Sequence, residues 1–173
     1  MLAKLQLSLW ELISNKPRKN NKSRQPQARQ ARTRQRKSRN SDQELKTLWR
    51  QIRSEWFPDR PEIDNYYVGW SNRPQKRTLA SCNIEYKRVV VARELNYEQH
   101  QKWLEPLLYH EMCHAILGYV QKRNYRSWHG KEFKQLEHQH PLMAEFDLWV
   151  KSGGWMTAVR SDRGKRAAKL RYG

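Results

Sequence analysis

The stretch YHEMCHAILG, residues 109–118, places two histidines four positions apart, with a glutamate directly after the first. On a helix, residues at this spacing lie on one face, one turn apart. A zinc ion binds neutral imidazole nitrogens at about 2.0–2.1 Å, so His110 and His114 can both reach one ion. Glu111 is adjacent to His110 in the chain, and its carboxylate can take a proton from a water without binding the metal. The stretch therefore predicts a helix that carries a zinc-dependent catalytic centre.

The alternative is an ordinary helix with one exposed histidine and one histidine whose polar atoms are satisfied in the core. The flanking residues Leu107, Leu108, Ile116 and Leu117 are apolar and indicate a buried helix. Two histidines and a glutamate in such a helix would be costly without partners, which favours the metal site.

A catalytic zinc site needs a third protein ligand and keeps its fourth position open. The chain offers several further candidates: His100, His129, His138 and His140, with the carboxylates of Glu132, Glu137 and Glu145. His129 is favoured because Gly130 relaxes the backbone where the next helix begins. His138 and His140 precede Pro141 and are interpreted as polar residues near the end of that helix.

A second motif follows the first. HEMCHA, residues 110–115, is followed by HGKEF, residues 129–133, with fourteen residues between His114 and His129. This pair resembles the SprT-like metallopeptidase domain, whose pattern is H-E-x-x-H, a variable connector and H-G-x-x-F. The resemblance covers about residues 41–150, because a helix, Trp70 and a valine-rich strand also precede the metal helix.

The resemblance implies that His110, His114 and His129 bind zinc as the cofactor, that Glu111 is the general base, and that Phe133 packs behind the third ligand. Zinc would polarise a peptide carbonyl, and Glu111 would pass the proton of the attacking water to the leaving amine. The expected function is peptide-bond hydrolysis by a zinc metallopeptidase. The alternatives are a nucleic-acid-binding protein with a structural zinc site and no protease activity, and a zinc hydrolase acting on a non-protein amide.

The expected fold class is α+β: a minimal zincin-like domain with a small, mostly antiparallel sheet, the H-E-x-x-H helix and flanking helices. A helix over residues 41–56 is predicted from the S-x-x-E capping box at its start and the stop at Pro58. Three short strands follow between residues 65 and 96, where β-branched and aromatic residues are frequent. The metal helix is expected to begin around Glu105, a short helix to follow His129, and a last helix to end at Gly153 and Gly154.

The positive charge is concentrated near the two ends of the chain. Of the formal net charge of +18, residues 16–39 contribute +11 and residues 160–173 contribute +5, which leaves +2 for residues 40–159. Such an excess argues for a polyanionic partner. The basic residues of the first segment that we expect to contact nucleic acid are Lys16, Arg18, Lys19, Lys22, Arg24, Arg29, Arg32, Arg34, Arg36, Lys37 and Arg39.

This pattern divides the chain into four parts. Residues 1–15 form a short amphipathic segment, with leucines at helical spacing. Residues 16–40 hold almost no apolar side chain and are expected to be a disordered basic arm. Residues 41–156 make the SprT-like metallopeptidase domain, and residues 157–173 make a basic C-terminal tail.

The best-known relatives, of the Spartan type, are DNA-dependent proteases that degrade proteins crosslinked to DNA and carry a cysteine-rich zinc module. This chain has only Cys82 and Cys113, so the basic arm is expected to supply DNA contact instead. The expected substrate is protein at or crosslinked to DNA, with backbone contact rather than base reading. A solvated solubility tail and attraction to an anionic membrane surface are the alternatives.

Two cysteines outside any CxxC arrangement do not support a disulfide scaffold, and no run of eighteen apolar residues occurs. We therefore expect a cytoplasmic protein, with association with the nucleoid as a further expectation. Cys113 is interpreted as small buried packing, and most tryptophans as core or cleft-wall residues.

Overall fold

The computed structural model describes residues 41–172 apart from residues 119, 123–124 and 128. The predictions for the amphipathic segment at residues 1–15 and for the basic arm at residues 16–40 lie outside these residues.

The first helix, α2 (Asp42–Trp56), begins where the capping box predicts. The Ser41 side chain accepts from the backbone N–H of Glu44, and the Glu44 side chain accepts from the backbone N–H of Ser41. These two bonds satisfy donors that a helix start otherwise leaves open. Leu45, Trp49 and Ile52 recur at helical spacing and are buried, so one face of α2 packs on the core.

A three-stranded sheet follows, built from β1 (Tyr67–Trp70), β2 (Ala80–Asn83) and β3 (Arg88–Val91) in the order β1-β3-β2. β2 and β3 form an antiparallel hairpin, whereas β1 pairs parallel with β3. The parallel pairing arises because residues 71–79 carry the chain past the position of β3, and the hairpin then returns it beside β1. The α+β class is confirmed, and the sheet is mixed.

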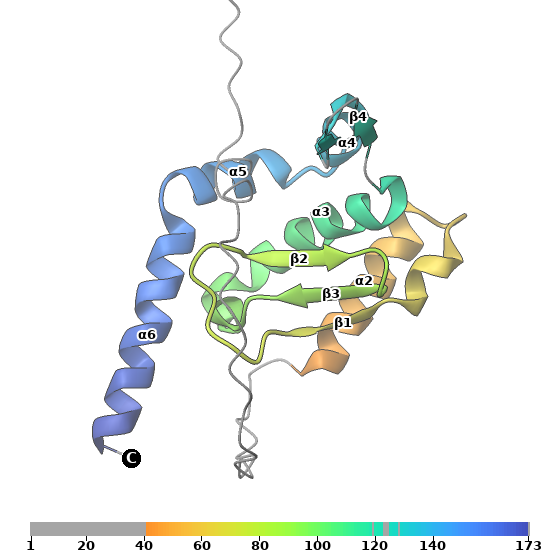
Figure 1. Ribbon diagram of the computed structural model, residues 1–173. Coiled ribbons are helices and arrows are strands. Elements are labelled where there is room, and N and C mark those ends of the chain that lie inside the picture. Colours follow the sequence, from red (N-terminus) through yellow and green to blue (C-terminus); the bar gives the residue numbers. More distant parts are fainter. Residues whose placement is uncertain (1–40, 119, 123–124, 128, 173) are drawn as a thin grey trace, which may run out of the picture.

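The metal helix α3 (Leu104–Leu117) lies with α2 on one face of this sheet (Figure 1). It starts one residue before the expected Glu105, and a 3-10 helix, η3 (Glu98–Trp103), leads into it. Pro106 falls in the first turn of α3, where its missing N–H costs nothing. The core lies between the two helices and the sheet, around Trp49, Val89 and Leu107, all fully buried.

Two further 3-10 helices border the sheet: η1 (Pro61–Asn65) before β1 and η2 (Arg93–Leu95) after β3. Beyond α3 the chain makes a small antiparallel pair, β4 (Val120–Lys122) and β5 (Tyr125–Ser127), which the sequence pattern did not indicate. The predicted short helix after His129 is α4 (Lys131–Glu137).

The C-terminal part differs from the expectation of a last helix followed by a tail. α5 (Met143–Lys151) does end before Gly153, whose φ of 88° suits glycine. The chain then continues into a long helix, α6 (Gly154–Tyr172), that runs along one side of the domain (Figure 1). The expected boundary between residues 156 and 157 therefore lies inside α6. Trp155 and Ala158, on either side of that boundary, are both buried in the core, so the start of α6 is part of the domain. Within the described ranges, none of the helices has both the length and the apolar composition of a membrane-spanning segment.

Candidate metal centre

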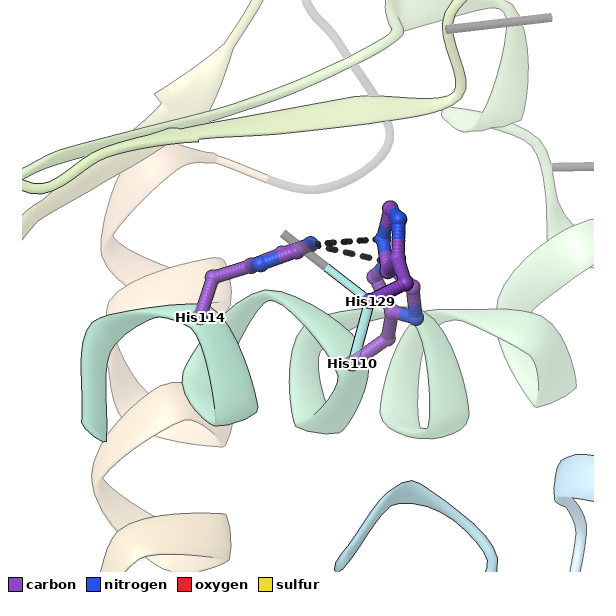
Figure 2. Close-up of side chains that lie close together, drawn as sticks. All are labelled: His110, His114 and His129. Carbon is purple, nitrogen blue, oxygen red and sulfur yellow. Dashed lines mark hydrogen bonds between the residues drawn. The ribbon is translucent and has the colours of Figure 1, made fainter. Parts of the chain in front are cut away.

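Three histidine side chains converge above the middle of α3 (Figure 2). His110 and His114 extend from α3 one turn apart. His129 directly precedes Gly130, which is the N-cap of α4. The Nε2 atom of His114 lies 3.2 Å from that of His110 and 3.1 Å from that of His129. One ligand atom from each residue lies within 4.8 Å of the others.

These distances fit a single metal ion. Two nitrogens bound tetrahedrally to zinc at about 2.0–2.1 Å lie about 3.3–3.4 Å apart, close to the observed separations. Three imidazoles without a thiolate are also a donor set typical of catalytic zinc, which keeps a fourth position open. The three histidines could therefore hold a metal ion, and among the described residues they are the only group of at least three metal-binding side chains so arranged.

The histidines of α3 lie in surroundings that favour the neutral imidazole. Burial lowers the pKa of His110 well below its usual value, and the adjacent His129 lowers it further. Burial, followed by the charges of His110 and His129, lowers the pKa of His114 to about 2. Neutral imidazole is the form that binds metals, so these side chains need lose no proton to bind one near neutral pH.

A carboxylate on α4 orients the first histidine. The Oε1 atom of Glu137 lies 2.5 Å from Nδ1 of His110, and the Glu137 side chain is 14% exposed. A carboxylate only accepts, so Nδ1–H donates to Glu137 and the lone pair of Nε2 faces the other two rings. Burial raises the pKa of the Glu137 carboxyl, which makes its carboxylate a stronger acceptor. The sequence suggested Glu137 as a possible third ligand, whereas the structure places it behind His110.

Glu111, the predicted general base, is 2% exposed and lies between α3 and β2. Burial raises its pKa to about 8, the nearby Glu137 raises it as well, and a hydrogen bond from the backbone N–H of Cys82 opposes the rise. A carboxyl group with a pKa near neutrality can both accept and return a proton. Its role as general base stays a prediction.

Phe133 packs against all three imidazoles. Its ring centroid lies 5.1 Å from that of His110, 4.5 Å from that of His114 and 4.8 Å from that of His129. The expectation that Phe133 packs behind the third histidine is confirmed, and the contact extends to the other two. An apolar ring at this position limits the rotation of the imidazoles.

The other histidine candidates lie away from this cluster. His100 packs against Trp149 with ring centroids 6.0 Å apart. His140, which is 2% exposed, packs against the rings of Trp56 and Tyr109, while His138 is exposed.

Two packing predictions can also be compared with the structure. Cys113 is fully buried, which confirms its interpretation as packing. Trp103 and Trp155 are buried core residues, as expected, and Trp149 stacks on Trp103 with ring centroids 5.2 Å apart. The eleven basic residues predicted to contact nucleic acid, from Lys16 to Arg39, lie outside the described residues.

A comparison with protein families agrees with this geometry. No curated protein and no solved structure matches the chain. The model of the SprT-like family matches residues 45–149, a range that runs from α2 to α5 and contains all three histidines. The chain therefore belongs to the SprT-like family.

Proposed function

We propose that this protein is a zinc-dependent metallopeptidase that hydrolyses peptide bonds in proteins at or crosslinked to DNA. The observation that carries the catalytic part is the convergence of His110, His114 and His129 beside the buried Glu111. The SprT-like family is consistent with a metalloprotease. When bound, zinc would supply a Lewis acid that polarises a carbonyl group and lowers the pKa of water.

The side chains of the protein have separate tasks in this reaction. His110, His114 and His129 would hold the ion, and Glu137 keeps the first imidazole in the tautomer whose Nε2 lone pair is free to bind it. Glu111 accepts the proton of the attacking water and returns it to the leaving amine. Because Glu111 is next to His110 on the same helix, α3 positions both the base and a ligand.

The arrangement of the sheet favours a polypeptide as the substrate over a non-protein amide. β2 is an edge strand, paired with β3 on one side only within the described part of the chain. Its residue Cys82 is hydrogen-bonded to Glu111 through the backbone N–H, so this edge borders the candidate base. An extended peptide can add to a free edge as a further strand, with its backbone groups paired and its scissile bond presented to the site.

The expectation that the protein acts near DNA is supported by charge. Residues 16–39 hold eleven Lys and Arg and no acid, so binding to phosphates would release counterions and depend strongly on salt. These residues include no aromatic side chain for stacking, so contact with the backbone is expected rather than base reading.

The test is cleavage of a DNA-binding protein by the zinc-loaded wild type and by Glu111→Gln, each with and without DNA. We expect cleavage by the wild type alone, increased by DNA, with equal zinc content in both proteins. If the zinc-loaded wild type cleaves nothing while DNA binding persists in both proteins, the protease assignment is wrong. A binding protein with structural zinc then becomes the better description.

A further inference from the structure

α6 is anchored to the domain by its first half. Trp155 and Ala158 are 2% and 1% exposed, and Asp162 is 4% exposed on the same face of the helix. The hydroxyl of Tyr97 donates to Oδ1 of Asp162 at 2.8 Å, and the Arg166 guanidinium lies 2.6 Å from Oδ2. α6 is thus held on the segment that follows η2 and is not a loose tail.

This anchoring uses the only acid of α6. Asp162 is buried against Tyr97 and Arg166, so its charge is compensated inside the contact. The exposed charged side chains of α6 are then all positive: Arg160, Arg163, Lys165, Lys169 and Arg171. These cations are carried by a helix that is anchored to the domain through Trp155, Ala158 and Asp162.

A second basic segment meets α6 at η2. Residues 71–79, which connect β1 to β2, are tied to η2 by three bonds: Arg93 N–H to Ser71 Oγ at 3.1 Å, Arg93 Nη1 to the carbonyl of Asn72 at 3.0 Å, and Gln75 N–H to Glu94 Oε1 at 2.8 Å. α6 packs against η2 as well. Glu94 is fully buried, so the acid at this junction does not reach the surface.

The connection itself presents only positive charge. Residues 71–79 contain no acid, and Arg73, Lys76 and Arg77 are all exposed. Both acids of the junction, Glu94 and Asp162, are buried, while the cations on either side of it are exposed. This connection also leads directly into β2, the strand whose edge borders Glu111.

We propose that residues 71–79 and α6 form one surface that binds the phosphate backbone of duplex DNA and places it beside the metal centre. This inference rests on the proposed function, and it names the surface that brings DNA to the site. We refer to it as the junction surface, defined by Arg73, Lys76, Arg77, Arg163, Lys169 and Arg171.

The side chains favour duplex DNA over other polyanions. A helix that lies on a membrane needs an apolar face, whereas the exposed apolar residues among 160–171 are Ala167, Ala168 and Leu170. Single-stranded nucleic acid is bound through aromatic stacking, and neither residues 71–79 nor residues 160–171 contain an aromatic residue. Cations without stacking rings suit the regularly spaced phosphates of a duplex, which carry no sequence information.

The test compares three variants of the full-length chain that each remove three positive charges. One carries Arg73→Gln, Lys76→Gln and Arg77→Gln, and the second carries Arg163→Gln, Lys169→Gln and Arg171→Gln. The matched control carries Lys46→Gln, Arg50→Gln and Lys87→Gln, which all lie outside the junction surface; Arg50 and Lys87 are exposed and Lys46 is half-buried. Each protein is titrated with duplex DNA at several salt concentrations, and its helical content is compared with that of the wild type.

We expect both junction variants to bind duplex DNA more weakly and with a smaller salt slope. Each lost phosphate contact lowers the slope of log K against log salt by about 0.9, so three contacts lower it by at most about 2.7. The control should keep the wild-type slope. The proposal would be overturned if the control bound duplex DNA as weakly as the junction variants do, or if the junction variants kept the wild-type salt slope.

Two further measurements separate the outcomes. Vesicles of phosphatidylcholine and phosphatidylserine serve as the membrane probe, and loss of vesicle binding with unchanged DNA binding would refute a DNA surface. Glu111→Gln serves to separate this inference from the proposed function. If neither Glu111→Gln nor the wild type cleaves protein, but the junction variants lose salt slope, the protease assignment fails and the junction surface stands.

Discussion

The hydrogen bond between Glu137 and His110 makes zinc affinity depend on a residue that touches no metal. Replacing Glu137 with alanine removes the acceptor of Nδ1–H, and Glu137→Gln keeps a neutral acceptor of similar shape. The bond is 2.5 Å long and its carboxylate is only 14% exposed, so water replaces it poorly. Loss of such a partner lowers metal affinity by about 10–100-fold, which corresponds to about 1.4–2.7 kcal/mol.

We therefore expect the zinc dissociation constant to increase by about 100-fold in Glu137→Ala and by about 10-fold in Glu137→Gln. The measurement is competition for zinc with a chromophoric chelator at fixed pH. Glu132→Gln is the matched control, because Glu132 is an exposed glutamate on the same helix α4. Zinc affinity of Glu137→Ala within about twofold of the wild type, with its helical content unchanged, would refute the reasoning.

Three further predictions follow from named contacts. His129→Ala should bind less than one zinc per chain, because only two of the converging imidazoles remain, and full stoichiometry by metal analysis would remove His129 from the site. Burial raises the pKa of Glu94, so its ionisation opposes folding, and the free energy of unfolding should fall as the pH rises above about 4.5. Glu94→Gln should abolish that part of the pH dependence in urea denaturation. Tyr97→Phe removes the hydrogen bond to Asp162 and should lower the free energy of unfolding by about 2 kcal/mol in denaturant unfolding. Amide exchange in α6 should become faster, and unchanged exchange there would show that Tyr97 does not anchor the helix.

The local elements were predictable because their signals lie within a few residues. The capping box of Ser41 and Glu44 located the start of α2, and Pro58 located its end to within two residues. The i, i+4 spacing of His110 and His114 placed both side chains on one face of α3, as observed. These signals act through bonds and side-chain spacing inside one helix, so no distant partner is needed to interpret them.

α6 shows why the C-terminal part was predicted differently. Charged residues dominate its composition. Its anchoring residues Trp155, Ala158 and Asp162 are buried because α6 packs against η2 and Tyr97, which are distant in the chain. The parallel pairing of β1 with β3 is a similar case, because the order of strands depends on where residues 71–79 carry the chain.

By itself, the sequence determined the metal helix, the adjacent base candidate and the excess of positive charge, since each is a property of residues close together in the chain. Only the tertiary structure decided that His129 meets His110 and His114, that Glu137 lies behind the first histidine, and that Phe133 touches all three rings. The physical reason is that these contacts join α3 to α4, which are separated in the chain by β4 and β5. Their geometry is set by how the helices pack, and no spacing along the chain specifies it.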